Sequence, residues 1–189
     1  MHIMKKKTAT VVVIILVVAA IVSIWLFKNA GSDSKSNSSK HAENQIDGII
    51  SPAYEDAFTL EATAIGLDEL KVYGIPIIID FGADSCIPCK EMAPVLRNLN
   101  SEMQGKAIIK FVDVWKNRQA ADGFPIQLIP TQVLVNSEGN PYVPSKDIGI
   151  EFTKYVMKDT GEHIFTVHQG GLTEDQMRKI LADMGIENE

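Results

Sequence analysis

The two cysteines of the sequence, Cys86 and Cys89, stand two residues apart at the end of an apolar run, and thiols at this spacing suit three kinds of chemistry. A disulfide that closes so short a loop restrains little chain entropy, which makes a structural staple a weak interpretation. Zinc usually needs four ligands, and the sequence offers neither a second cysteine pair nor a nearby histidine pair. We therefore predict a redox pair, with no metal site and no cofactor beyond the Cys86–Cys89 disulfide.

The residues around the cysteines predict how they are positioned. Residues 75–81, "IPIIIDF", form a continuous β-branched run, typical of a strand buried on both faces. After a turn, apolar residues recur at helical spacing through residues 89–103, with a kink expected at Pro94. Cys86 then falls at a helix N-terminus, where free N–H groups and positive potential stabilise a thiolate, the form that attacks disulfides. We expect Cys86 to be the exposed nucleophile and Cys89, deeper in the helix, to resolve the mixed disulfide.

The rest of the domain alternates strand and helix patterns and ends in a hairpin and a helix. A short helix closed by glycine is expected at 67–74, and the last helix runs from an N-cap at Thr173 to a C-cap at Gly185. Further strands are expected at residues 57–62, 107–114, 131–135, 152–157 and 163–168. This order predicts an α/β fold, with a central mixed β-sheet flanked by helices.

The N-terminal part of the chain predicts a membrane anchor. Residues 1–7 form a short basic end that we expect on the cytoplasmic side. Residues 8–27 carry no charge, and as a helix they would reach about 30 Å, the thickness of a bilayer's hydrocarbon core. A cleaved signal peptide is the alternative, but a lysine stands where a small residue would be expected near its cleavage site.

Both interpretations place the folded domain outside the cytoplasm. Residues 28–45 are rich in serine, asparagine and charge and predict a flexible linker, and residues 46–189 predict the folded domain. We expect a single-pass protein of the cell membrane, held by its N-terminal helix, with an extracytoplasmic C-terminal domain. The net charge of −6 and the lack of a basic stripe with interleaved aromatics argue against a nucleic-acid partner.

The stretch "IIIDFGADSCIPCKEMAPVL" resembles the active-site region of thioredoxins. Asp80 matches the family's buried aspartate, Pro94 its helix-kinking proline, and Pro130 the cis-proline that faces the cysteines in an "IPT" context. The resemblance implies a thioredoxin-like fold and a thiol–disulfide oxidoreductase acting on protein disulfides. Burial raises the pKa of a carboxyl, which suits Asp80 to relay a proton to Cys89 as its sulfur leaves.

The same resemblance assigns substrate contacts. A cis-Pro130 would present the backbone of Ile129 to an extended substrate segment, as in strand addition. Ile87 and Pro88, between the cysteines, would affect the redox potential because they set the hydrogen-bond donors near the Cys86 sulfur.

The chain departs from the thioredoxin pattern in three places. Ser85 and Gly82 stand where the family usually has aromatic residues, so the surface facing the substrate should be less apolar. Phe111 aligns with a lysine near the buried aspartate, and Lys110 should point to the other face. Residues 141–153 exceed the family's short turn and are either a lid or partner surface, or simply a long loop.

The direction of electron flow is predicted from the dipeptide and the chain length. Disulfide oxidases of this fold carry an inserted helical domain, for which the 41-residue separation of Pro130 from Cys89 leaves no room. An aliphatic residue and a proline between the cysteines favour a disulfide reductase. No NADPH or flavin motif is present, so a membrane thiol carrier, as in cytochrome c biogenesis, should supply electrons. An oxidase or isomerase, and a copper-binding thioredoxin-like chaperone, are the alternatives.

Overall fold

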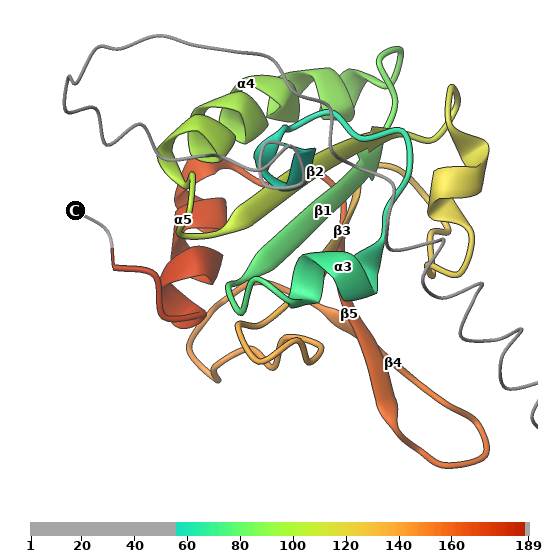
Figure 1. Ribbon diagram of the computed structural model, residues 1–189, viewed down its shortest axis with the longest axis vertical. Coiled ribbons are helices and arrows are strands. Elements are labelled where there is room, and N and C mark those ends of the chain that lie inside the picture. Colours follow the sequence, from blue (N-terminus) through green and yellow to red (C-terminus); the bar gives the residue numbers. More distant parts are fainter. Residues whose placement is uncertain (1–55, 188–189) are drawn as a thin grey trace, which may run out of the picture. The chain divides into compact units, whose positions relative to one another are not determined.

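The computed structural model describes residues 56–187, which fold around one mixed sheet. The five strands are β1 (Ile77–Gly82), β2 (Ile108–Asp113), β3 (Thr131–Val135), β4 (Thr153–Val156) and β5 (His163–Gln169). Their order within the described residues is β2-β1-β3-β5-β4 (Figure 1). Only β1 and β2 are parallel, and the other neighbours are antiparallel, so the predicted mixed sheet is confirmed.

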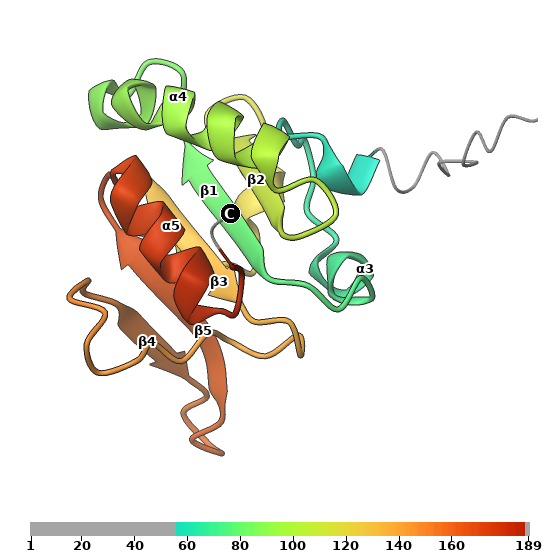
Figure 2. The same cartoon turned by 90° about the vertical axis from the view of Figure 1, so that its left-hand side faces the viewer.

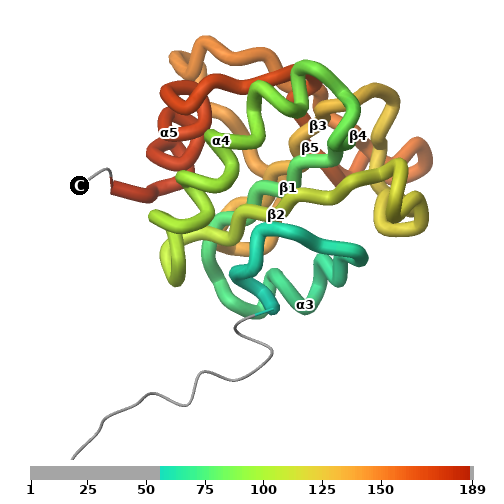
Figure 3. Tube along the Cα trace, turned by 90° about the horizontal axis from the view of Figure 1, so that it is seen from above, coloured from blue at the N-terminus to red at the C-terminus, as the bar shows by residue number. Residues whose placement is uncertain are grey.

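Helices cover both faces of this sheet. The helices α4 (Ile87–Glu102) and α5 (Glu174–Asp183) lie side by side on one face, and the short helix α3 (Leu67–Lys71) lies on the other (Figures 2 and 3). A 3₁₀ turn at Arg118–Ala121 also contributes to the core on the α3 side. Because strand side chains alternate between the faces, β1 sends Ile78 to the α4 side and Ile77 and Ile79 to the α3 side.

Local sequence signals explain where the helices begin and end. The hydroxyl of the predicted N-cap Thr173 accepts a hydrogen bond from the Gln176 backbone N–H, and the Gln176 side chain accepts one from the Thr173 backbone N–H, which forms a capping box. Gly185 was predicted to be the C-cap of the last helix. Met184 is the C-cap instead, and Gly185 is the residue after it, with φ of 94°. Pro94 lies inside α4, as predicted.

The strand predicted at residues 57–62 is wrong. Residues 56–58 are helical, and Glu61 makes only an isolated bridge to Phe111. Consecutive residues of a strand face opposite sides, yet Ala57 and Phe58 are both buried in the same cluster. The segment therefore packs as a short turn of helix against the core rather than as a sheet strand.

The long segment at residues 141–153 packs against β3, β5 and α5. Tyr142 is buried, its backbone N–H donates to Leu134, and its hydroxyl donates to Asp183 of α5. Asp183 also accepts the Ser145 backbone N–H at 3.0 Å. These contacts hold the loop on the sheet face, whereas a function as a lid or partner surface stays a prediction.

The predicted basic end, anchor and linker, residues 1–7, 8–27 and 28–45, lie outside the described residues, as does the predicted start of the domain at residue 46. Within residues 56–187, no helix combines the length and the apolar character needed to cross a bilayer.

Candidate active site

The cysteine pair lies at the junction between the end of β1 and the start of α4. β1 ends at Gly82, the Cys86 N–H donates to Ala83 at 3.1 Å, and Cys86 is the N-cap of α4. The structure contains a Cys86–Cys89 disulfide, with the two Cα atoms 5.2 Å apart. Cys89 is 3% exposed, whereas Cys86 is half-buried, so the predicted difference in accessibility is confirmed.

The dipeptide between the cysteines forms the first turn of α4 and determines its free N–H groups. An N-cap side chain normally accepts from the backbone N–H of the second or third helical residue. Here the second is Pro88, which has no N–H, so only the Cys89 N–H can serve the Cys86 sulfur. The helix terminus therefore stabilises a Cys86 thiolate less than a terminus with both donors would.

A loop from the neighbouring strand faces the exposed cysteine. The Ile129–Pro130 peptide bond is cis, and the Cys86 Sγ lies 3.9 Å from the carbonyl oxygen of Ile129. The Thr131 hydroxyl donates to the Leu128 carbonyl at 2.7 Å and so fixes the loop before β3. This confirms the predicted cis bond and its place beside the cysteines, while a substrate-binding role for Ile129 and Pro130 stays a prediction.

Asp80 is fully buried in the middle of β1. Its cross-strand partners are Phe111 on β2 and Gln132 on β3. Its Oδ1 accepts a 2.6 Å hydrogen bond from Gln132 Nε2, and its Oδ2 has no partner. Burial raises the pKa of Asp80 to about 7, although the hydrogen bond from Gln132 lowers it. A carboxyl with this pKa can both give and take a proton near neutral pH.

Gly82 leaves space between the carboxyl and the buried cysteine. A Cβ atom on Gly82 would lie 3.2 Å from the Cys89 Sγ and 3.4 Å from the Asp80 Oδ2. The same atom would come within 2.9 Å of the Phe111 ring, closer than such contacts normally are. The Asp80 Oδ2 and the Cys89 sulfur therefore border the same small volume, and the absence of a side chain at Gly82 keeps this volume open.

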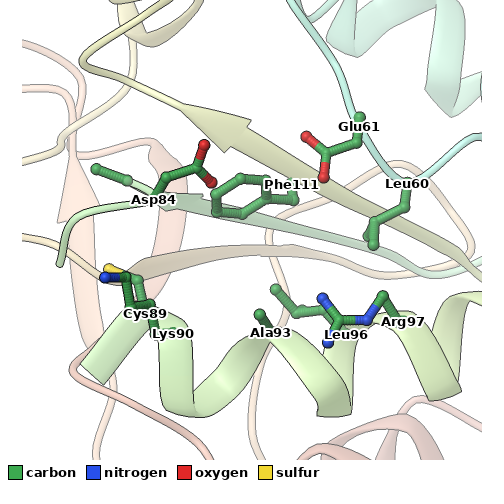
Figure 4. A pocket seen from close by; sticks show the side chains of 10 residues that line it. Leu60, Glu61, Asp84, Cys89, Lys90, Ala93, Leu96, Arg97 and Phe111 are labelled. Carbon is green, nitrogen blue, oxygen red and sulfur yellow. The ribbon is translucent and has the colours of Figure 1, made fainter. Parts of the chain in front are cut away.

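A cavity of about 90 Å³ reaches Cys89 from the side of α4 and β2 (Figure 4). The ring of Phe111 lies over α4 and forms one wall. Charged side chains line the cavity as well: Glu61, Asp84, Lys90 and Arg97. Charged groups thus line the cavity that reaches the buried cysteine, on the side where the chain lacks the lysine expected from the resemblance.

Asp113, at the end of β2, is a site residue that the sequence did not reveal. It is buried, and its carboxylate accepts backbone N–H groups from Asp84, Trp115 and Lys116. Burial alone would raise the pKa of Asp113, but these hydrogen bonds outweigh it, so the pKa lies below its usual value. Asp113 thereby ties the turn after β2 to the loop before Cys86. Its position at the end of a buried strand was the available signal.

Trp115 is a second residue that the sequence did not reveal. It supplies an exposed aromatic side chain near the active-site loop, where Gly82 and Ser85 supply none. It is 62% exposed, and its backbone is held to Asp113 beside the active-site loop. Ile87 and Leu128 are exposed as well, on the two segments that flank Cys86. The surface near Cys86 is thus more apolar than Gly82 and Ser85 alone predicted.

Possible metal ligands are sparse in the part of the chain that the structure describes. No group of three or more histidine, cysteine or acidic side chains in residues 56–187 is arranged to hold a metal ion. The predicted lack of a metal site and of a cofactor stays a prediction.

A cysteine pair at a helix N-terminus, flanked by a proline loop and a buried carboxyl, defines a thiol–disulfide redox domain. The thioredoxin family model matches residues 68–156. Thioredoxin from Staphylococcus haemolyticus is 38% identical over 82 residues, which cover 43% of this chain and 77% of that protein. The chain belongs to the thioredoxin family of thiol–disulfide oxidoreductases.

Other relatives match over less of their own length. Thioredoxin 1 from Chlorobaculum tepidum is 40% identical over 67 residues, 35% of this chain and 66% of that protein. A bifunctional thioredoxin reductase/thioredoxin from Mycobacterium leprae is 30% identical over 119 residues, 58% of this chain and only 26% of that protein. Among solved structures, chloroplastic thioredoxin z is similar at 21% identity with a TM-score of 0.43, over 67% of this chain and 96% of that one.

Proposed function

We propose that the protein is a membrane-anchored, extracytoplasmic disulfide reductase. In its reduced form, the Cys86 thiolate attacks a substrate disulfide and forms a mixed disulfide, which releases one substrate thiol. Cys89 then attacks the Cys86 sulfur and releases the second substrate thiol. Two electrons pass from the Cys86–Cys89 dithiol to the substrate disulfide, and the protein is left as the disulfide seen in the structure.

The single observation that carries the reaction is the position of the cysteines. Cys86 is the half-buried N-cap of α4, and Cys89 lies buried one turn inside the helix, beside the Asp80 carboxyl. This arrangement separates an accessible attacking sulfur from a protected resolving sulfur. Asp80, with its pKa near 7, is the group that would accept the Cys89 proton during resolution.

The proposed direction rests on Pro88. A strong oxidant of this kind needs a reduced form that is stabilised through its thiolate. Pro88 removes one of the two N–H groups that would serve the Cys86 sulfur, which leaves the thiolate less stabilised and the dithiol more reducing. The oxidase and isomerase alternatives instead require a more strongly stabilised thiolate and a less reducing dithiol.

The exposed apolar side chains around Cys86 support protein substrates. Ile87 is 71% exposed, Trp115 62% and Leu128 48%, and all three lie on segments that border the cysteine pair. An extended peptide segment would contact these side chains while its backbone pairs with Ile129, at the carbonyl next to the Cys86 sulfur.

The anchor and the electron supply are proposed from the sequence. Residues 8–27 are uncharged and long enough to span a bilayer, and the lysines before them favour an extracytoplasmic domain. A domain there would lie away from cytoplasmic reductants, and the sequence has no NADPH or flavin motif. A membrane thiol carrier is therefore the proposed electron donor.

The direction is tested by equilibrating the full-length protein in dithiothreitol and glutathione buffers of graded potential and trapping free thiols. We expect the Cys86–Cys89 pair to have a potential more negative than about −200 mV. A Pro88→Ala variant restores an N–H donor and should have a less negative potential. A wild-type potential near −120 mV, the range of a strong oxidant, would overturn the reductase assignment.

The location is tested separately in intact cells. The full-length chain should stay with membranes in high salt, and protease added outside should cleave the linker at residues 28–45. Release of a shorter species that begins after Phe27 would show a cleaved signal peptide instead.

A further inference from the structure

Gln132 is a fully buried amide that the proposed reaction has not yet used. It lies on β3, two residues after Pro130, and faces Asp80 across the strand pair. Its Nε2 donates to the Asp80 Oδ1 at 2.6 Å and lies 3.5 Å from the Met92 sulfur of α4. Its Oε1 has no hydrogen-bond partner, which is costly for a buried polar atom. Packing alone does not explain a long polar side chain that is fully buried with one polar atom unpaired.

We propose that Gln132 is the positioning residue that turns the Asp80 carboxyl so that Oδ2 faces Cys89 and takes its proton. The proposal rests on the thiol–disulfide exchange proposed above. Gln132 itself does not touch the sulfur or the substrate; it acts through Asp80.

The geometry supports this division of roles between the two carboxyl oxygens. Gln132 occupies Oδ1, which fixes the plane of the carboxyl and leaves Oδ2 without a partner. Oδ2 borders the space next to Gly82 that the Cys89 sulfur also borders. The free oxygen is thus the one on the side of the thiol that must lose its proton.

Gln132 also tunes the charge of Asp80 without adding a charge of its own. A donor to the carboxylate favours the ionised form, against the desolvation that favours the neutral form. Without the amide, burial would leave the carboxyl protonated near neutral pH and unable to act as a base. A cationic partner would stabilise the carboxylate further, and the carboxyl would then be a weaker base.

Other ionisable groups lie around Asp80 but do not replace Gln132. On α4, Cys89 borders the same space as the carboxyl, and Lys90 and Arg97 line the cavity under the Phe111 ring. Glu61 and Asp84, from the loops before β1 and α4, line the same cavity. On β2, Asp113 is held by backbone N–H groups and Lys110 donates to backbone carbonyls. On β5, His168 is the register partner of Gln132 and contacts the Glu151 carbonyl. The side-chain hydrogen bond that reaches Asp80 within the described residues comes from Gln132.

The resolving step moves one proton and exchanges one sulfur–sulfur bond for another. In the mixed disulfide, the Cys89 thiol gives its proton to the Asp80 Oδ2, and its sulfur forms a bond to the Cys86 sulfur. The bond between Cys86 and the substrate sulfur breaks, and the substrate sulfur leaves with the electron pair and takes a proton from water. Asp80 returns its proton when the protein disulfide is reduced again.

The test compares Gln132→Leu with Gln104→Leu in the full-length protein. Gln104 makes backbone hydrogen bonds near the end of α4, so its variant is the same chemical change away from Asp80. Two quantities are measured: the carboxyl titration of Asp80 by ¹³C NMR in the oxidised protein, and the pH dependence of the resolving step with a mixed disulfide preformed on Cys86. The Asp80→Asn variant identifies the carboxyl signal.

In Gln132→Leu, the Asp80 carboxyl should become at least about tenfold weaker as an acid, because a hydrogen bond to the charged form is lost. The pH profile of the resolving step should move to higher pH by the same amount, about one pH unit or more. Gln104→Leu should match the wild type in both the titration and the pH profile. In the Asp80→Asn background, Gln132→Leu should leave the shape of the pH profile unchanged.

An unchanged Asp80 titration in Gln132→Leu would overturn the proposal, as would a profile shift that persists without the Asp80 carboxyl. If Gln132→Leu does not fold, Gln132→Asn, which withdraws the amide by one methylene, takes its place with the same expected direction. If the wild type resolves no mixed disulfide, the proposed function fails, and the carboxyl titration still decides whether Gln132 controls Asp80.

Discussion

Asp80 and Lys110 are two buried ionisable residues on neighbouring strands, and they are held in opposite ways. Lys110 packs on the α3 side of the sheet and donates to the backbone carbonyls of Asp56 and Thr59. Asp80 faces the α4 side, where one carboxyl oxygen receives a single amide N–H and the other receives nothing. One residue step along β2 separates Phe111, the register partner of Asp80, from Lys110.

The difference in hydrogen bonding indicates that Lys110 has a structural role and Asp80 a reactive one. The contacts of Lys110 tie the segment at residues 56–62 to the sheet, although burial lowers the pKa of its ammonium group. Asp80 is held incompletely, beside a sulfur that has to exchange a proton, and its pKa of about 7 lies where either state can form. The hydrogen bonds of Lys110 stabilise the fold, whereas the unpaired oxygen of Asp80 stays available for chemistry.

Asp80→Asn should give the largest effect, because it removes the proton acceptor. The resolving step should slow by about a hundredfold near pH 7, the lower range for loss of a general base. Stopped-flow measurement of substrate thiol release from a preformed mixed disulfide gives this rate. A rate within twofold of wild type would mean that Asp80 is a structural residue like Lys110.

The same variant should change how stability depends on pH. The folded-state pKa of Asp80, about 7, lies above the ordinary value of 3.8 because the carboxyl is buried, so the folded protein binds the proton more tightly than the unfolded chain. Wild-type stability from this group is present below pH 4 and is lost as pH rises toward 7. Asp80→Asn should therefore be more stable than wild type by about 2–4 kcal/mol at pH 8, with the advantage shrinking toward pH 4. Urea unfolding across this range measures the difference, and an advantage that does not vary with pH would contradict the assignment.

Lys110→Met should act on stability and spare the chemistry. The variant keeps the apolar stem but leaves the carbonyls of Asp56 and Thr59 without their charged donor, at a cost of about 2 kcal/mol. Denaturant unfolding checks the stability loss, and the rate of the resolving step should match the wild type. A slowed step with normal stability would show that Lys110 influences the site across the sheet.

Phe111→Lys should give the smallest effect, a change in the pH at which Asp80 titrates. An ammonium group beside the carboxyl favours its ionised form, so the pKa of Asp80 should fall by about one unit or more. Phe111→Leu is the matched control, because it changes the size of the cavity wall without adding a charge. The pH profile of the resolving step should move to lower pH in the lysine variant alone, and equal shifts in both variants would point to packing instead of charge.

Much of the fold could be predicted because its signals are local. The apolar run of β1, the helical spacing of α4 and the cap at Thr173 each specify an element from its own residues. The strand predicted at residues 57–62 failed because its alternation was overridden by tertiary contacts. Ala57 and Phe58 pack into one cluster, and Lys110 binds the carbonyls of that segment.

The candidate site was only partly visible in the sequence. Cys86, Cys89 and Asp80 carry their chemistry in their residue types and spacing, and the opposite orientations of Lys110 and Phe111 follow from strand alternation. Gln132 is different, since a glutamine in an apolar strand acquires meaning only through the antiparallel register with β1. Registers between strands distant in sequence are not encoded in either strand alone.

The roles of the two sulfurs are tested most directly by the Cys89→Ser variant. Offered a model disulfide substrate, the reduced full-length variant should stop at a mixed disulfide on Cys86, which mass spectrometry of the trapped peptide identifies. Cys86→Ser under the same conditions should trap nothing, because the buried Cys89 cannot reach the substrate. A mixed disulfide found on Cys89 in Cys86→Ser, with none on Cys86 in Cys89→Ser, would contradict the assignment of the two sulfurs and the mechanism built on it.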